Sequence, residues 1–457
     1  MRRRLIVAFW ALTGLVVSSD RVWGRQTPGE SADRLSLAQA VELALERNPL
    51  IRSVQAGVSQ AEAGLAEAEA GRLPNLSFEQ GFTNSNNPVY VFGTLLEQER
   101  FGAEHFDPAF LNSPGSLSNF RSTVNLQMPL FNRFQVSSAI RQARLQQETA
   151  QAEEEWIRQQ LRHRVVQAYF GVAVADFRRQ VAEEAVKSAE ADLERIRNKV
   201  DSGVAVVSDL LAMQVQLAEF GQRLVETEGD LRTAYAALNT LLDWPLERSV
   251  QLDTALIERD FPVADVQALV AEAVKNRPDY RNAERQVAVA RELVRSARGE
   301  YWPDLNLFAS VGRSSGNLKD GSGDFAVGAR LSWNLVDFGR EPRIRGRLAA
   351  VKAAEAERDA LEQEIRLEIV RAVEQCRSAA ERVRLARAAV DQADETLRIV
   401  RDRFEVGLTT ITEVLRAQTA SLQARLNVLG ALYQHYVSFS QVQLAAAKLR
   451  DLSWFLD

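Results

Sequence analysis

The sequence predicts a mainly α-helical chain that carries a small membrane β-sheet and is built as a tandem duplication. Three observations lead to this prediction. Two runs of about 70 residues show the apolar periodicity of helices, four short segments alternate between apolar and polar residues, and two long stretches align with each other without a gap. Helices of this length pack along one another as a tube, and strands at one end of it can cross a bilayer.

The composition favours long uninterrupted helices. Of the 457 residues, 46% are apolar and 26% are charged, with only 12 prolines and 24 glycines. The formal net charge of -5 arises from 56 basic and 61 acidic residues that are spread along the chain. Since no basic stripe is present to neutralise phosphates, nucleic acid is excluded as a partner.

Residues 1–24 have the pattern of a secretory signal peptide, with three arginines, an apolar core at 5–17 and a cleavage position after Gly24. The alternative is an N-terminal membrane anchor. A membrane-spanning helix needs about 20 apolar residues, and the apolar core at 5–17 is shorter than that. The only cysteine is Cys376, so the exported chain has no disulfide and no cysteine near the cleavage position for a lipid.

The duplication is clearest in the segments that begin at residues 48 and 277. In the ungapped alignment Pro49 falls on Pro278, and Pro74 falls on Pro303. Each repeat is expected to contain a helix, two strands, a long helix and a return helix. We expect a first repeat, an equatorial connector, a second repeat and a tail, at residues 25–242, 243–264, 265–450 and 451–457.

The long helices are predicted at about 133–202 and 339–406. At about 1.5 Å per residue each is about 100 Å long, which exceeds any compact domain and requires a tube of parallel neighbours. Shorter helices are expected at about 204–242 and 408–450, where the chain returns along the long helices, and at about 265–298. The connector, interrupted by two prolines, would form a belt around the middle of the tube together with residues near the termini.

Four strands are predicted, at about 75–83, 122–130, 304–312 and 325–335. In the last of them apolar residues alternate with a face that contains Arg330, and this face would line the lumen of a barrel. The alternative is a soluble sheet packed on helices. However, strands at the end of helices about 100 Å long have little helix surface to cover them.

Four strands cannot close a barrel, and an open edge in lipid leaves backbone groups without hydrogen bonds. Three copies of four strands would give a twelve-stranded barrel that continues into the helical tube. The first hairpin has a long loop at about 84–120, and the second a short one at 313–324. The aromatic residues of the long loop could fold over the mouth of the barrel. Alternatively, the loop could be a variable, exposed segment that has no role in the mechanism.

The two return helices begin after similar segments, "SGVA" at 202–205 and "VGLT" at 406–409. A long helix that reverses sharply needs a residue that tolerates a positive φ, and glycine is the usual one. We therefore expect Gly203 and Gly407 to mark two turns at the same end of the tube.

Several of these features together resemble one family, the TolC-like outer membrane efflux channels. They are the duplicated layout, the paired strand starts after Pro74 and Pro303, "NLVDFGR" at 334–340, and the R-x-x-x-G-L-T-x-x-x-E-V-L pattern from Arg403 to Leu415. The resemblance implies a homotrimer with a twelve-stranded barrel in outer membrane lipid and a large periplasmic α-barrel.

The resemblance further implies a passive exit channel for efflux or type I secretion. Its turns would meet a periplasmic adaptor protein of the membrane fusion class, which is coupled to an inner-membrane efflux pump or ABC secretion transporter. The residues implied at this adaptor-docking tip are Ser202, Gly203, Val204, Val406, Gly407, Leu408 and Thr409. In a trimer the two turns of each chain would form a rim with pseudo-sixfold symmetry.

An acidic residue follows each glycine by six positions, Asp209 in the first repeat and Glu413 in the second. The resemblance implies that these two residues form an acidic ring at the pore constriction and bias the closed pore toward cations. The alternative is helix-end chemistry, since Thr410 and Glu413 fit a capping box. Three positions further on the chain has Ala212 and Arg416, so a second acidic ring is not supported.

No catalytic constellation is present, and we expect neither an enzyme nor a cofactor or metal site. The three histidines, His105, His163 and His435, are scattered, and we expect the last two on helix surfaces. Two other classes compete with a channel: an exported coiled-coil structural protein and a periplasmic adaptor. Neither requires two matched pairs of amphipathic strands. The cargo stays open among drugs, metal ions and secreted polypeptides.

Overall fold

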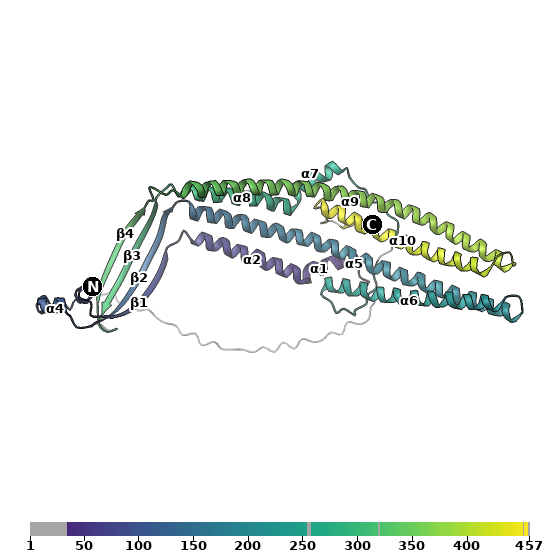
Figure 1. Ribbon diagram of the computed structural model, residues 1–457, viewed down its shortest axis with the longest axis horizontal. Helices are drawn as coiled ribbons and strands as arrows, with labels where there is room; N and C mark the ends of the chain where they lie inside the picture. Colours follow the sequence, from purple (N-terminus) through teal and green to yellow (C-terminus); the bar gives the residue numbers. More distant parts are fainter. Residues whose placement is uncertain (1–33, 254–256, 319, 451, 456–457) are drawn as a thin grey trace, which may run out of the picture.

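The structure is a computed structural model that describes residues 34–253, 257–318, 320–450 and 452–455. The expected signal peptide lies outside these residues. The molecule is a long helical rod with a tilted sheet at one end and two helical hairpins at the other (Figure 1). Within the described residues, no helix combines the length and apolar character needed to cross a membrane.

The two halves of the chain contain the same elements in the same order. The first half has α1 (Leu37–Arg47), α2 (Pro49–Ala70), β1 (Asn75–Ser85), β2 (Leu117–Asn132), α5 (Gln135–Asp201) and α6 (Val207–Leu242). The second has α7 (Val266–Asn276), α8 (Pro278–Gly299), β3 (Asp304–Ser315), β4 (Ser322–Ser332), α9 (Arg340–Glu405) and α10 (Ile411–Ala445). The first half also contains α3 (Pro88–Glu97), η1 (Ala103–Phe106) and α4 (Pro108–Asn112), and η2 (Ser453–Phe455) follows α10.

The single helix expected at 265–298 is wrong, because two helices, α7 and α8, occupy this segment. The backbone of Arg277 is extended, at φ -65° and ψ 124°, and Pro278 opens α8. A residue that precedes proline is disfavoured in the α conformation, which explains the break. Asn48 and Pro49 separate α1 from α2 in the same way.

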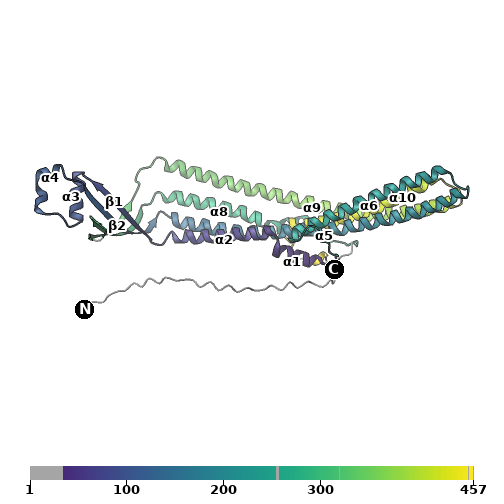
Figure 2. The same cartoon turned by 90° about the horizontal axis from the view of Figure 1, so that it is seen from below.

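The long helices α5 and α9 contain 67 and 66 residues and form the frame of the rod. Near the sheet, α2 packs on α5, while α8 contacts both α5 and α9. Toward the far end, α6 packs on α5 and α10 packs on α9 (Figure 2). Each long helix therefore has different partners along its two halves.

The main hydrophobic core lies at the middle of the rod. Tyr169 and Phe170 of α5 pack there with Tyr436 and Phe439 of α10, and the ring of Phe261 from the connector stacks on Phe439 at 4.3 Å. The hydroxyl group of Tyr169 donates to the Leu35 carbonyl at 2.8 Å. Leu35 in turn pairs with Leu252 in a parallel bridge, so residues near the N-terminal end of the described chain join the connector as a belt.

The sheet has the order β1-β2-β3-β4 with antiparallel neighbours. Its register aligns the alternating patterns: Phe78 pairs with Val124, Val124 with Val311, and Val311 with Phe325. One face is consequently apolar across all strands, and the other carries polar residues. The strand boundaries differ from those expected, most of all for β4, which begins at Ser322 and ends at Ser332 instead of spanning 325–335.

The outer strands β1 and β4 each have a neighbour on one side only. Their free edges expose backbone groups that lipid cannot satisfy, so the apolar face can enter a bilayer only when further copies complete the barrel.

Candidate functional site

The two turns at the far end of the rod share one backbone conformation. Gly203 and Gly407 both have φ 76°, as expected for glycine at a sharp helix reversal. In the first turn Val204 N–H donates to the Lys199 carbonyl at 2.8 Å, and Gly203 N–H donates to Val200 at 2.9 Å. The corresponding bonds recur around Gly407, and the pattern is that of a Schellman motif.

The turns expose apolar side chains to solvent. Val204, Val406 and Leu408 are 75%, 70% and 68% exposed, and the two glycines are also exposed. Thr409 is half-buried and Ser202 is exposed. Apolar residues clustered on a projecting end are typical of a surface that another protein covers.

Asp209 and Glu413 lie in the first turns of α6 and α10. The alternative interpretation, a capping box at Thr410, is wrong: Thr410 is the N-cap residue, but its side chain makes no capping hydrogen bond. The carboxylate of Glu413 instead pairs with Arg416, one turn further along α10, at 3.0 Å. Glu413 is therefore partly neutralised by its own helix.

A buried carboxylate further from the turns connects the two hairpins. Asp192 on α5 is 8% exposed and accepts hydrogen bonds from Arg401 on α9 at 3.0 Å and from Gln418 on α10. Arg401 also donates to the hydroxyl of Ser188 at 2.7 Å. This network is not predictable from the sequence, because nothing in the order of residues places α9 beside Asp192.

Between this network and the turns, the hairpins border a partly open pocket of about 370 Å³. Its lining includes Lys199 of α5, Phe404 of α9 and Ile411 of α10. The pocket therefore lies between the two hairpins, next to their turns.

At the opposite end, Arg330 lies on the polar face of the sheet. It pairs in register with Asn306, and its guanidinium lies 5.7 Å from the centre of the Phe308 ring. The neighbouring apolar residue Leu331 points to the other face and is 61% exposed.

The expectation that His163 and His435 lie on helix surfaces is wrong. Both are buried, and Nδ1 of His163 is 2.8 Å from the hydroxyl of Ser440 on α10. Burial lowers the pKa of His163 to about 4. Across the described part of the chain, no group of three or more potential metal ligands comes together.

Comparisons with known proteins agree with this architecture. The family model described as outer membrane efflux protein matches residues 40–243 and 269–448. The alkaline protease secretion protein AprF of Pseudomonas aeruginosa is 25% identical over 442 residues, which cover 92% of this chain and 86% of AprF. The outer membrane protein TolC of Vibrio cholerae is 21% identical over 426 residues and covers 91% of each chain.

Among solved structures, the outer-membrane channel OprN superposes with a TM-score of 0.76 at 20% identity, over 90% of each chain. The fold class expected from the sequence is confirmed: four strands per chain form part of a trimeric barrel that continues into a helical barrel. The resemblance, the outer membrane location and the large periplasmic part are likewise confirmed. The chain belongs to the outer membrane efflux protein family, the TolC-like channels of efflux and secretion.

Proposed function

We propose that this channel is the exit duct of a tripartite efflux or type I secretion system, opened at its periplasmic turns by an adaptor protein. The observation that carries the proposal is the pairing of two matched, exposed apolar turns at one end of the rod with an open-edged amphipathic sheet at the other. A passive conduit needs an outer membrane exit and an inner docking end, and the chain offers one candidate for each.

The adaptor-docking tip comprises Ser202, Gly203 and Val204 in the first turn and Val406, Gly407, Leu408 and Thr409 in the second. Three exposed apolar side chains support this assignment, since they would lose water contact when covered by a partner. The two turns have the same backbone geometry, so a trimer would present six similar surfaces. An adaptor of matching symmetry would dock between an inner-membrane efflux pump or ABC secretion transporter and this rim.

Asp209 and Glu413 form the acidic constriction of the closed pore in this proposal. Their position in the first turns of α6 and α10 puts them close behind the rim. Because Arg416 pairs with Glu413, Asp209 would exert the larger share of the field on a passing cation. Arg330 would face the lumen of the barrel at the other end, where its charge acts on cargo that leaves.

Opening would separate the α9–α10 hairpin from α5. The hydrogen bonds of Asp192 with Arg401 and Gln418 oppose this separation, and the pocket of about 370 Å³ lies between the hairpins that would move apart. An adaptor that binds the turns more tightly in the open arrangement would shift the equilibrium toward it.

The test combines mass and conductance of the mature chain purified in mild detergent. We expect a protein mass of three chains, and cation-selective channels of low conductance in planar bilayers. A stable monomer, or a trimer that conducts no ions under any condition, would overturn the proposal. The kind of cargo follows from the inner-membrane partner; similarity to a protein named for alkaline protease secretion supports a secreted polypeptide as one candidate.

A further inference from the structure

The long loop between β1 and β2 is folded as a small helical unit. It contains α3, η1 and α4, and it extends past the end of the sheet that is remote from the rod (Figures 1 and 2). Both α-helices have a local start signal: the Asn87 side chain caps α3 and the Asp107 side chain caps α4, and a proline follows each cap. We call residues 88–112 the mouth unit.

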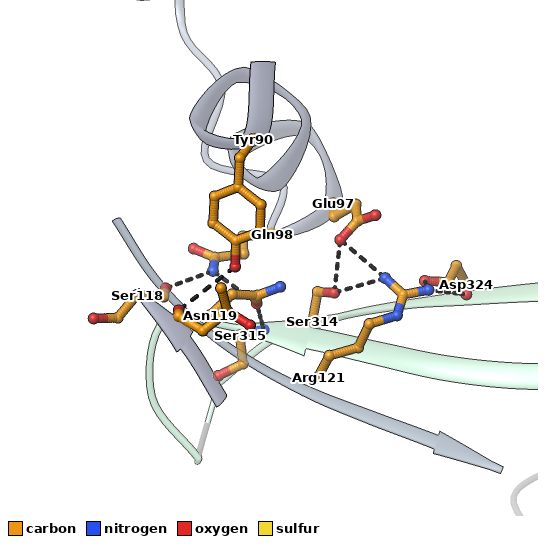
Figure 3. Close-up of polar contacts among 10 residues, drawn as sticks. Tyr90, Glu97, Gln98, Ser118, Asn119, Arg121, Ser314, Ser315 and Asp324 are labelled. Carbon is orange, nitrogen blue, oxygen red and sulfur yellow. Dashed lines mark hydrogen bonds and ion pairs between the residues drawn. The ribbon is translucent and has the colours of Figure 1, made fainter. Parts of the chain in front are cut away.

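The C-terminal end of α3 is bound to side chains of three strands. The Glu97 carboxylate pairs with Arg121 of β2 at 2.9 Å and accepts from the hydroxyl of Ser314 on β3 at 3.0 Å. Arg121 also pairs with Asp324 of β4 at 3.1 Å (Figure 3). One acidic residue of the mouth unit is therefore connected to β2, β3 and β4.

The next two residues continue this contact. The buried amide of Gln98 donates to the Asn119 side chain and to the Ser118 carbonyl, each at 3.0 Å. Glu99 accepts from the hydroxyl of Ser322, and its backbone has φ 52° in the turn that ends α3. A positive φ is costly for glutamate, so a backbone in this conformation is maintained by its surroundings.

The strand side chains that make these contacts all lie on the polar face of the sheet. Arg121 pairs in register with Ser314, and Ser314 pairs with Ser322. The row of Val124, Val311 and Phe325 belongs to the opposite, apolar face. Since lipid covers the apolar face of a membrane barrel, α3 is anchored to the side that faces the lumen.

We propose that the mouth unit is a lid over the outer opening of the barrel, latched to the lumen wall by Glu97, Gln98 and Glu99. The inference rests on the trimeric channel proposed above, in which three such lids converge on one opening. Val89, Leu96 and Phe106 expose 82%, 51% and 65% of their surface in the single chain. Such apolar residues at an aqueous mouth would be covered by the lids of the other two copies.

The latch is suited to release. The side chains of Glu97 and Arg121 are 45% and 39% exposed, and ion pairs in this setting contribute little each. The lid itself is held together by rings, with Phe101 4.8 Å from Phe92 and 5.1 Å from Phe106. It can therefore swing away as a unit when the polar contacts break, so cargo would pass a second gate after the periplasmic one.

Accessibility of the lumen from outside tests the lid without depending on the state of the turns. Asn125→Cys places a thiol on the polar face of β2, and the native Cys376 is buried. We expect a bulky polyethylene-glycol maleimide added to intact cells to label this thiol slowly in the otherwise unchanged chain. Glu97→Gln with Glu99→Gln, and separately replacement of residues 88–112 by a short glycine-serine linker, should speed labelling several-fold.

Glu104→Gln is the matched control, because Glu104 belongs to the same unit and, within the described part of the chain, forms no ion pair with a strand; its carboxylate lies 3.4 Å from Nδ1 of His105. It should label at the unchanged rate. Equal labelling rates with and without the lid would overturn the inference. If the thiol stays unlabelled even without the lid, while a small maleimide labels it only in detergent-unfolded protein, Asn125 does not line a lumen and the channel proposal fails with it.

Discussion

The carboxylate of Asp192 on α5 lies 3.0 Å from the guanidinium of Arg401 on α9, and this pair joins the two repeats near their turns. Arg401→Ala removes one donor from the buried Asp192, which costs about 1 to 3 kcal/mol in the arrangement that contains this contact. We expect the variant to show higher single-channel conductance, or more frequent open events, than the unchanged trimer.

The control for this prediction is Arg398→Ala, because among the residues that the structure describes Arg398 pairs with Glu395 and Asp402 of its own helix and with no other helix. It removes the same charge one turn away without separating the hairpins. If both variants alter conductance equally, the effect comes from pore charge, and the Asp192–Arg401 contact is not a restraint on opening.

Ion selectivity should depend unequally on the two acids behind the turns. Asp209→Asn is expected to reduce cation preference more than Glu413→Gln, because Arg416 already pairs with Glu413. Arg416→Ala should raise cation preference by freeing the Glu413 carboxylate. Reversal potentials in a salt gradient measure the cation preference of all three variants. An unchanged cation preference in the Asp209→Asn, Glu413→Gln double variant would contradict the assignment of these two residues to the pore constriction.

Substitution of the turn glycines should destabilise the turns through backbone strain alone. At Gly407 no atom lies within 4 Å of an added Cβ, so Gly407→Ala meets only the strain of φ 76°, about 1 to 2 kcal/mol. Gly229→Ala in the middle of α6 also enters open space, but there alanine should stabilise the helix by about 0.5 to 1 kcal/mol. Hydrogen exchange of the turn amides should become faster in the first variant only, and equal exchange in both would contradict this account.

Features fixed by local chemistry were predictable, and those that depend on distant neighbours were not. Glycine at positions 203 and 407 predicts a positive φ, and this prediction does not depend on how the helices pack. By contrast, the burial of His163 requires knowing that α10 brings Ser440 against it. The capping box at Thr410 was a reasonable local pattern, but Glu413 has a better partner in Arg416.

The mouth unit shows the same division between local and distant causes. Two signals for the mouth unit were present in the sequence, since Asn87-Pro88 and Asp107-Pro108 are both helix starts inside the long loop. Its attachment to the lumen face was not visible, because the register that aligns Arg121 with Ser314 joins strands from different repeats.

Arg277 should be the most sensitive charged residue at the junction of the two halves. Its side chain is 5% exposed, donates to Asp279 at 2.7 Å and to Glu368 of α9 at 2.6 Å, and lies over the ring of Trp156. Arg277→Met leaves two carboxylates without their cation, at a cost of about 3 to 5 kcal/mol. Denaturant unfolding of the trimer measures this loss.

Arg291→Ala is the comparison for Arg277, because the exposed pair of Arg291 with Glu355 contributes about 0 to 1 kcal/mol. A loss for Arg277→Met no larger than that of Arg291→Ala would show that the buried cluster is not a stability determinant.

Stability should fall on acidification in a way that depends on His163. Burial lowers the pKa of this histidine from 6.5 to about 4 in the folded chain. Above pH 6.5 the imidazole is neutral in both the folded and the unfolded state, so it does not change the free energy of unfolding with pH. Between pH 6.5 and 4 the unfolded chain takes up the proton and the folded chain does not. The free energy of unfolding should therefore decline through this window by up to roughly 3 kcal/mol, with no further contribution from His163 below it.

His163→Gln should flatten this part of the profile, because glutamine does not titrate and its amide can still bond to Ser440. Burial also lowers the pKa of His435, so the double variant His163→Gln, His435→Gln should be flatter still. Unfolding of the trimer between pH 7 and pH 4 gives the three profiles, and subtraction of each variant from the unchanged protein removes the titration of carboxylates common to all. If the unchanged protein and His163→Gln lose stability in parallel across the window, His163 is protonated in the folded chain, and its burial does not control acid sensitivity.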